Sequence, residues 1–272
     1  MAEDGHACYV YGVVPDENGA QGGQADQTVK DVPVVGGQES PITFIRREGL
    51  AAVVSEVPTG KPLGTPDDLS AHARVLDTLA ASGLPVLPFR FGTVVRDTQA
   101  VTDELLTEGQ ADFQWALDRL RGSAQYTLRA RYVQDEVLRE VLEEHEEARR
   151  LREELEGLPE AAGYDQRIQL GQLVVEAIAA KRETDAREIE HRLAPFALGV
   201  ATSEPASAEG VVNAAFLIED GKREAFEHAA EELAREWHGR IRLRLLGPQA
   251  PYDFVADALR RGEGEGESEE GG

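Results

Sequence analysis

Hydrophobic and polar positions recur along this chain in blocks that predict short strands alternating with helices. Residues 8–14 form an apolar run that predicts a strand. Two further runs, 42–46 and 50–57, flank Glu48-Gly49 and predict a β-hairpin. The sequence Thr65-Pro66-Asp67-Asp68 predicts the start of a helix, because it combines a hydroxyl cap, a proline in the first turn and two acids at the positive end of the helix dipole.

The helix that begins there is expected to carry Val75 and Leu79 on its apolar face and to end at Gly83. Between the first strand and the hairpin, residues 15–41 are rich in Gly, Asp and Gln, which predicts a flexible loop. Residues 84–95 are largely apolar and predict an extended segment, which more helix follows.

Beyond Gly122, apolar and polar residues alternate over 126–132 and predict a half-buried strand. Two long charged helices follow, joined by a turn at 157–163, and together they predict an antiparallel helical hairpin over about 134–192 that is partly coiled-coil-like. The inward apolar positions are expected to be Val137, Val141, Ala148, Leu151, Leu155 and Leu158 in the first helix and Ile168, Val175, Ile178, Ile189 and Leu193 in the second.

Three more strands and one helix complete the pattern. The strands are predicted at 196–200, 212–218 and 241–245, and an amphipathic helix is predicted at 226–237. The order strand, helices, strand, strand, helix, strand is that of a ferredoxin-like βαββαβ domain whose first helix is replaced by the hairpin.

These elements predict an α+β protein of two domains. The first, 1–122, is an N-terminal α+β domain, and the second, 123–258, is ferredoxin-like with the helical hairpin inserted. Residues 259–272 are rich in Gly and Glu and are expected to form a disordered acidic tail, because they have almost nothing to bury.

The net charge of the chain argues against some classes of partner. The 272 residues include 28 Lys and Arg against 51 Asp and Glu, a formal net charge of −23. A charge of this sign repels phosphate backbones, so no nucleic-acid partner is expected. No uncharged apolar run approaches the roughly 20 residues that span a bilayer, and the first residues do not resemble a signal peptide. With Cys8 as its single cysteine, the chain is expected in the cytoplasm.

Motifs for catalysis or cofactor binding are incomplete. Gly60-Lys61 resembles the end of a phosphate-binding loop, but Ser55 and Pro62 stand where glycine and a hydroxyl residue are needed. His6 and Cys8 are too few for a zinc site, which takes three or four ligands. No histidine belongs to a nucleophile motif. The sequence therefore predicts no catalytic residues, no cofactor and no metal.

The segment Pro88-Phe89-Arg90-Phe91-Gly92 is unusual in this chain. In an extended backbone, Phe89 and Phe91 point to one side and Arg90 to the other. Two interpretations stay open. Either the aromatic rings belong to the core and Arg90 is a surface or ion-paired residue, or Arg90 anchors a partner or orders a domain contact. His72, on the preceding helix, is expected to be a helix-edge histidine.

A basic stripe is the second unusual feature. The first and last strands of a ferredoxin-like sheet are neighbours, which would place Arg129 and Arg131 near Arg240, Arg242 and Arg244 on one face. Either the Glu-rich hairpin covers this face and pairs with it, or the face docks an acidic segment of a partner. An RNA-recognition module is disfavoured, because its sheet needs aromatic platforms.

Several segments together resemble a known protein family. They occur in the expected order over nearly the whole chain, and the PFRFGT and GP-x-x-PYDF segments are the most specific. The matching stretches are YVYGVV at 9–14, HARVLDTLAASGLPVLPFRFGTVV at 72–95, AQYTLRARY at 124–132, NAAFLIEDGKREAFE at 213–227 and GPQAPYDFV at 247–255. The chain thus resembles the gas vesicle accessory proteins of the GvpF/GvpL family, departing at Gln249-Ala250, where the family tends to have an apolar residue and proline.

The resemblance implies a structural or assembly protein associated with gas vesicles, without catalytic residues. It also implies binding of the small hydrophobic major shell protein and of other gas vesicle accessory proteins. A strongly acidic protein that covers an apolar shell subunit would keep it from aggregating. The candidate contacts are the PFRFGT and GPQAPYDF segments, especially Arg90, Phe91, Tyr252 and Phe254. The alternative is that these residues, the phenylalanines above all, pack between the two domains.

Three alternatives remain. An enzyme could lie hidden between the domains; a ligand-sensing ferredoxin-like regulator would need a homodimer and a small-molecule pocket; and a coiled-coil scaffold would be unrelated to vesicles. One sequence does not separate an F-type from an L-type role.

Overall fold

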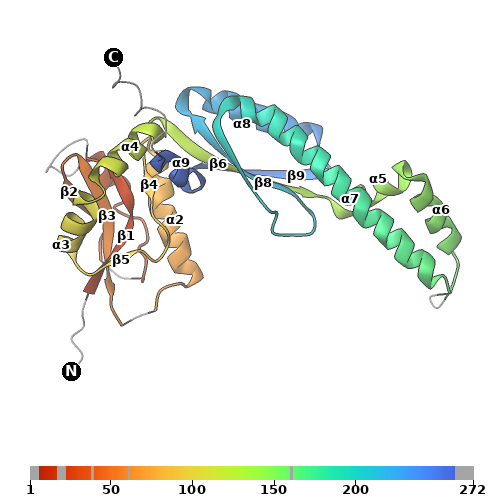
Figure 1. Cartoon of the computed structure of the whole chain (residues 1–272), viewed down its shortest axis with the longest axis horizontal. Coiled ribbons are helices and arrows are strands. Elements are labelled where there is room, and N and C mark those ends of the chain that lie inside the picture. Colours follow the sequence, from red (N-terminus) through yellow and green to blue (C-terminus); the bar gives the residue numbers. More distant parts are fainter. Residues whose placement is uncertain (1–5, 17–22, 38–39, 61, 160–161, 261–272) are drawn as a thin grey trace, which may run out of the picture. The chain divides into compact units, whose positions relative to one another are not determined.

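A computed structural model of the chain describes residues 6–16, 23–37, 40–60, 62–159 and 162–260. It is a mixed α+β structure with two antiparallel sheets (Figure 1). The chain forms two compact units, which are described separately below. The first unit comprises Met1–Tyr126, Leu217–Asp220 and Gly247–Gly272, and the second comprises Thr127–Phe216 and Gly221–Leu246.

The sheet of the first unit is built around its first strand. Its strands are β1 (His6–Pro15), β2 (Thr43–Arg47), β3 (Leu50–Pro58), β4 (Leu87–Pro88) and β5 (Val94–Val95). The order is β2-β3-β1-β4, and β5 also pairs with β1. The predicted first strand and hairpin are confirmed. The hairpin turns at Glu48 and Gly49, both with positive φ.

The core of the first unit forms between β1 and the helix α2 (Pro66–Ala81). Tyr9, Tyr11 and Val14 on the strand and Val75 and Leu79 on the helix are buried and belong to one core cluster. The predicted start of α2 is confirmed, since the Thr65 side chain accepts a hydrogen bond from the Asp68 backbone N–H.

Residues 23–37 differ from the flexible loop that the composition predicts. They contain the short helix α1 (Gln24–Thr28), and Val29 and Val35 are buried at 1% and 0% exposure. The Val35 N–H donates to the Tyr11 hydroxyl at 3.0 Å. These two buried valines hold the segment in place. The composition of the segment, which is mostly polar, does not predict that they are buried. Positions 17–22 and 38–39 lie outside the described residues.

The C-terminal segment packs within the first unit. Ala250 is fully buried in its core, and the Ala250 N–H donates to Asp77 Oδ1 at 2.9 Å. After it, α9 (Val255–Leu259) packs against α4 (Gln110–Leu120), as Figure 1 shows. Short helical segments precede α4: α3 (Thr98–Ala100) and a π-helical segment, Val101–Thr107. Each predicted domain, 1–122 or 123–258, is one continuous stretch, whereas the first unit also includes this C-terminal segment. The predicted disordered tail, 259–272, begins at Leu259, the last residue of α9, and its residues 261–272 lie outside the described residues.

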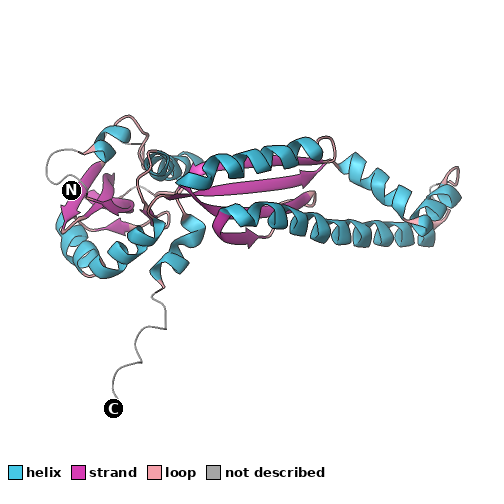
Figure 2. Cartoon of the chain, turned by 90° about the horizontal axis from the view of Figure 1, so that it is seen from above, coloured by secondary structure: helices cyan, strands magenta, loops and turns pink. Residues whose placement is uncertain are grey.

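The second sheet has the order β7-β8-β6-β9. Its strands are β6 (Ser123–Tyr132), β7 (Ala197–Ser203), β8 (Gly210–Glu219) and β9 (Ile241–Gln249). All four predicted strands are confirmed, as is the amphipathic helix α8 (Arg223–Glu236). The helices α7 (Tyr164–Leu193) and α8 lie over the same face of this sheet (Figures 1 and 2).

The helical hairpin differs from its prediction in two respects. Its first arm is broken into α5 (Gln134–Glu144) and α6 (Glu146–Leu155), because His145 has an extended backbone. Between Val141 and Ala148 the chain is dense in glutamate and offers no buried anchor that would hold a straight helix. In α7, the predicted inward residues Ile168 and Val175 are 45% and 68% exposed.

Within the part of the chain that the structure describes, no helix combines the length and apolar character needed to cross a membrane.

Candidate functional site

An aromatic cluster in the first unit joins segments that are far apart in sequence. Tyr9 comes from β1, His72 from α2, Phe91 from the turn after β4, and Tyr252 from the C-terminal segment. The His72 ring lies 5.7 Å from Tyr9, 5.7 Å from Phe91 and 6.1 Å from Tyr252 between ring centroids. The two segments that are most specific for the family resemblance therefore meet around one histidine.

Hydrogen bonds fix the state of His72. Its Nε2 lies 3.2 Å from the Phe89 carbonyl oxygen, which can only accept, so Nε2 carries the proton. Its Nδ1, 2.9 Å from the Tyr9 hydroxyl, then accepts, and the Tyr9 oxygen accepts from the Gly92 N–H at 3.1 Å. Burial lowers the pKa of His72, opposed by the bond to Phe89. Burial also raises the pKa of Tyr9 to about 12.

His72 thus holds the turn at 89–92 and is not the helix-edge residue that the sequence predicts; it is 4% exposed. Its periodic position among polar residues on α2 gave no sign of these contacts. Both ring nitrogens are engaged with structural groups, so the histidine has no free nitrogen with which to serve as a general base in this arrangement.

A buried carboxylate fixes the loops beside the cluster. Asp68 accepts hydrogen bonds from the backbone N–H groups of Gly36, Gly64 and Thr65 and from the Thr65 hydroxyl. Burial alone would raise the pKa of Asp68, but these bonds lower it to about 2. Asp68 therefore stays ionised and ties the 34–37 segment to the start of α2.

The predicted contact residues of these segments divide by exposure. Arg90 is exposed and forms no ion pair with any described residue, Phe91 is half-buried, and Tyr252 is 37% exposed. These three residues are here called the Arg90 patch; the Phe91 and Tyr252 rings both lie beside the His72 ring. Phe254 is 5% exposed, so in this structure it is a packing residue and offers no surface to a partner.

Four of the five predicted arginines form an exposed group on the second sheet, here called the arginine face: Arg129, Arg131, Arg242 and Arg244. They alternate along the neighbouring strands β6 and β9 with buried or half-buried apolar residues. The Val133 N–H donates to the Arg240 carbonyl at 2.9 Å. Counting a regular antiparallel ladder from this bond places Arg131 opposite Arg242 and Arg129 opposite Arg244.

Arg240 differs from the four arginines of this group, because it is paired with carboxylates of the helical hairpin. Its guanidinium donates to both carboxylate oxygens of Asp185 on α7, at 3.0 and 2.8 Å, and to Glu140 on α5 at 2.8 and 3.0 Å. The Tyr132 hydroxyl donates to the same Asp185, which is 8% exposed. Of the two interpretations of the basic stripe, pairing with the hairpin therefore applies to Arg240. Arg240 does not belong to the exposed group, although the sequence predicted it there.

The hairpin carries an apolar surface that the sequence interpretation missed. Tyr164, Ile168 and Val175 are 72%, 45% and 68% exposed. At 3.6 residues per turn they lie in one line along α7, and they are here called the α7 apolar row. Residues 168–180 are apolar on both sides of the helix, so the sequence did indicate a second apolar surface. The sequence interpretation instead assigned these apolar residues to a single inward stripe. Beside the row, a hollow of about 430 Å³ is lined by Arg152, Leu155, Glu156, Arg167, Leu170 and Gly171.

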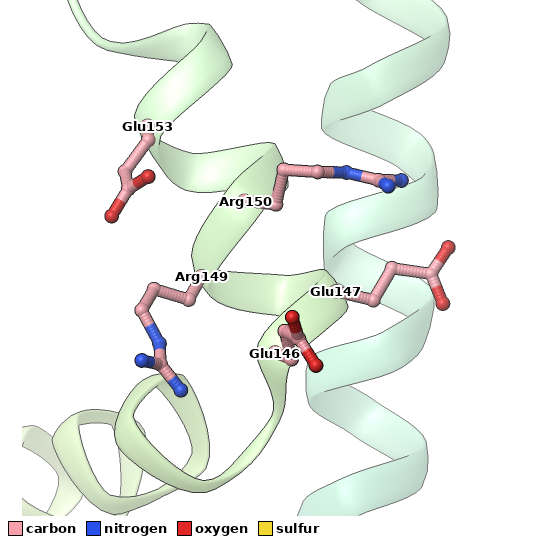
Figure 3. A pocket seen from close by; sticks show the side chains of 5 residues that line it. All are labelled: Glu146, Glu147, Arg149, Arg150 and Glu153. Carbon is pink, nitrogen blue, oxygen red and sulfur yellow. The ribbon is translucent and has the colours of Figure 1, made fainter.

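A larger hollow of about 820 Å³ on α6 is lined by charged residues alone, namely Glu146, Glu147, Arg149, Arg150 and Glu153. Figure 3 shows Glu147 and Arg150 pointing towards α7 and Glu153 pointing away from it. Arg149 donates to the Glu143 carbonyl, and Glu147 accepts from Gln169. The lining offers neither a nucleophile nor a neutral base. Across the described ranges, no group of three or more His, Cys, Asp or Glu side chains could hold a metal ion.

Comparison with known proteins gives a consistent result. A family model described as gas vesicle synthesis protein GvpL/GvpF matches residues 7–256. Gas vesicle protein F of Streptomyces sp. is 32% identical over 225 residues, covering 81% of this chain and 90% of that protein. Gas vesicle protein F of Nostoc sp. is 25% identical over 249 residues, covering 91% and 97%.

Solved structures agree with the fold. The crystal structure of the gas vesicle protein GvpF from Anabaena sp. has a TM-score of 0.73 at 25% identity, covering 92% of this chain and 98% of that one. GvpF from Microcystis aeruginosa, at 22% identity, has a TM-score of 0.69 with the same coverage.

Proposed function

We propose, from the premise that this chain belongs to the GvpL/GvpF family of gas vesicle synthesis proteins, that it binds the small hydrophobic shell protein of the gas vesicle. The family match over residues 7–256 supports a gas vesicle accessory role. The proposal adds the partner and the surface. Binding would take place during nucleation or growth of the shell, or in the finished shell as a minor component.

The observation that carries the proposal is the α7 apolar row. Tyr164 and Val175 are among the most exposed large apolar side chains of the described structure, and Ile168 lies between them on the same line. Exposed apolar surface of this kind marks an interaction site in a soluble protein. A row at helical spacing fits an apolar helix or strand of a partner laid along α7.

The charge of the chain supports the same role. A net charge of −23 makes copies of the protein repel one another. A complex with an apolar subunit would then stay soluble while its apolar contact is covered. The Arg90 patch is proposed as a second contact, because it combines an exposed arginine that forms no ion pair with any described residue and two partly exposed aromatic residues.

The remaining proposals follow the family. We assign the second sheet and its helices to a ferredoxin-like domain, which its strand order β7-β8-β6-β9 supports. The domain limits 1–122 and 123–258, a cytoplasmic location and binding of other gas vesicle accessory proteins stay proposals of the same kind.

Replacing Ile168 and Val175 together by glutamate is expected to reduce capture of the shell protein at least about ten-fold. Two charges on the row would have to be desolvated on binding, and each costs several kcal/mol unless it is paired. The measurement is a co-expression pull-down with a tagged full-length chain, in which captured shell protein is quantified relative to the tagged protein.

Gln166→Glu is the matched control, because Gln166 is exposed on the same helix but on the opposite side from the row, two residues from Tyr164. It is expected to capture as the wild type does. Full capture by the Ile168→Glu, Val175→Glu variant would reject α7 as the contact. If Arg90→Glu then abolished capture, the Arg90 patch would take its place.

A further inference from the structure

The arginine face lies on the side of the second sheet that α7 and α8 do not cover (Figures 1 and 2). The Tyr132 hydroxyl donates to a carboxylate of α7, so this side chain points towards the helices. Because successive side chains of a strand point to opposite faces, the exposed Arg131 points away from them. On β9, the exposed Arg242 follows the buried Ile241 in the same way. The other two arginines of the face occupy the next alternate positions of the two strands.

These four arginines form two pairs of like charges at close range. Arg131 stands opposite Arg242, and Arg129 stands opposite Arg244. Side chains in such positions have Cβ atoms about 4.5–5.5 Å apart, and like charges there destabilise a sheet. None of the four forms an ion pair with a carboxylate of the described residues. Glu209 is influenced by Arg131, but hydrogen bonds are the larger cause of its lowered pKa. In a chain with 51 acidic residues, this face thus keeps an uncompensated positive charge.

The spacing of the two pairs defines the anion that fits them. Alternate residues of a strand lie about 6.6 Å apart, so the two pairs have this separation along β6 and β9. A carboxylate placed between two opposed arginines can accept charge-assisted hydrogen bonds from both guanidinium groups. Alternate side chains of an extended peptide also lie on one side, about 6.6 Å apart. A Glu-x-Glu or Asp-x-Asp sequence can therefore place one carboxylate at each pair.

We propose that the arginine face binds an extended segment of a partner protein that carries acidic residues at alternate positions. Exposed ion pairs are individually weak, but here four arginines act on one segment. Binding also removes the repulsion between the opposed arginines, which the free protein carries. The proposal is independent of shell-protein binding, which is assigned to other surfaces.

A short protein segment fits this face better than a nucleic acid or a membrane does. The net charge of −23 repels a long run of phosphates or an anionic bilayer that extends beyond the face. Single-stranded nucleic acids also need aromatic side chains on which bases stack. The exposed residues of β6 and β9 are arginines and one glycine. An extended acidic segment needs only the two strands themselves.

The test is fluorescence anisotropy with the full-length chain and a labelled peptide of alternating glutamate and threonine, at about 0.15 M salt. The wild-type chain is expected to bind this peptide with a Kd below about 1 mM. Arg131→Gln with Arg242→Gln removes one opposed pair, so one carboxylate loses both donors and binding should weaken about ten-fold. A peptide with the same number of glutamates at every third position should bind at least about three-fold more weakly, because its successive glutamates point to opposite sides.

Two control variants make the result specific. Arg187→Gln with Arg235→Gln makes the same change in charge at exposed positions of α7 and α8, which lie over the other face of the sheet. This variant should bind the peptide as the wild type does. The Ile168→Glu, Val175→Glu variant should also bind it, which separates this proposal from shell-protein binding by α7.

A stability measurement separates binding from folding. The urea midpoint of the Arg131→Gln, Arg242→Gln variant, followed through Trp237 in a Trp115→Phe background, should not fall, because the change removes an unfavourable pair. A midpoint that falls together with the affinity would assign these arginines to the fold and overturn the proposal. No binding by the wild type up to about 1 mM peptide would also overturn it. So would equal or tighter binding of an oligothymidylate of about twelve nucleotides, which would make the face a phosphate site.

Discussion

Gly12→Ala is expected to destabilise the first unit by about 4 kcal/mol or to prevent it from folding. Gly12 lies on β1, between β3 and β4, where a Cβ would meet the Leu87 carbonyl oxygen at 2.5 Å and Pro88 Cα at 3.2 Å. The closest obstacle is backbone of the neighbouring strand, so no side-chain rotation relieves it. Changes of this size are exceptional and come from such mechanisms as overpacking of a core.

The measurement is urea unfolding followed by tryptophan fluorescence. The chain has two tryptophans, Trp115 in the first unit and Trp237 in the second. A Trp237→Phe background therefore reports on the first unit alone, which matters because two units need not unfold together. Gly60→Ala is the control, because Gly60 also lies in the first unit. A Cβ there has open space, so the substitution should not destabilise the unit and should stabilise it by no more than about 1 kcal/mol. An unchanged midpoint for Gly12→Ala would show that the strands are not packed this closely.

Asp185→Ala is expected to destabilise the second unit by about 3 kcal/mol. The change removes the bidentate partner of Arg240 and the acceptor of the buried Tyr132 hydroxyl in one step. Breaking a buried pair from one side costs about 3–5 kcal/mol. We expect the lower end of this range of destabilisation, because the Arg240 side chain is 27% exposed and retains its ion pair with Glu140.

This unfolding is followed through Trp237 in a Trp115→Phe background. The Arg240 guanidinium lies 5.8 Å from the Trp237 ring, so the fluorescence reports directly on the network. Glu183→Ala, at an exposed position on the same helix, should change stability by less than about 0.5 kcal/mol. If both substitutions cost the same, the bonds to Asp185 contribute nothing specific to the fold.

Local patterns in the sequence were sufficient for most of the secondary structure. The strand at β1, the hairpin of β2 and β3 and the capped start of α2 each depend on neighbouring residues, and each is confirmed. The four strands of the second sheet follow from alternation in the same way. Period and capping are properties of short stretches, so one sequence reveals them.

The contacts that join distant segments could not be predicted in this way. Nothing near Ala250 indicates that its N–H would bond to Asp77, and nothing near His72 indicates that it would meet Tyr252. Val29 and Val35 are single apolar residues in a polar stretch, and only their tertiary position makes them core residues. Such contacts depend on the fold as a whole.

The basic stripe illustrates how far the candidate sites could be predicted. Alternation on two neighbouring strands grouped Arg129, Arg131, Arg242 and Arg244, and the structure shows that all four are exposed. It also included Arg240, because the sequence does not show that Asp185 lies opposite it. The α7 apolar row was missed for a related reason: a helix that is apolar on two sides does not reveal which side is covered.

The most direct test of the central claim is the partition of the shell protein between supernatant and pellet after co-expression with the wild-type chain. A strongly acidic protein that covers an apolar subunit should move the shell protein into the supernatant and elute with it as one complex in size-exclusion chromatography. The Ile168→Glu, Val175→Glu variant should return the shell protein to the pellet. A shell protein that is already soluble alone, yet never elutes with the wild-type chain, would contradict the account.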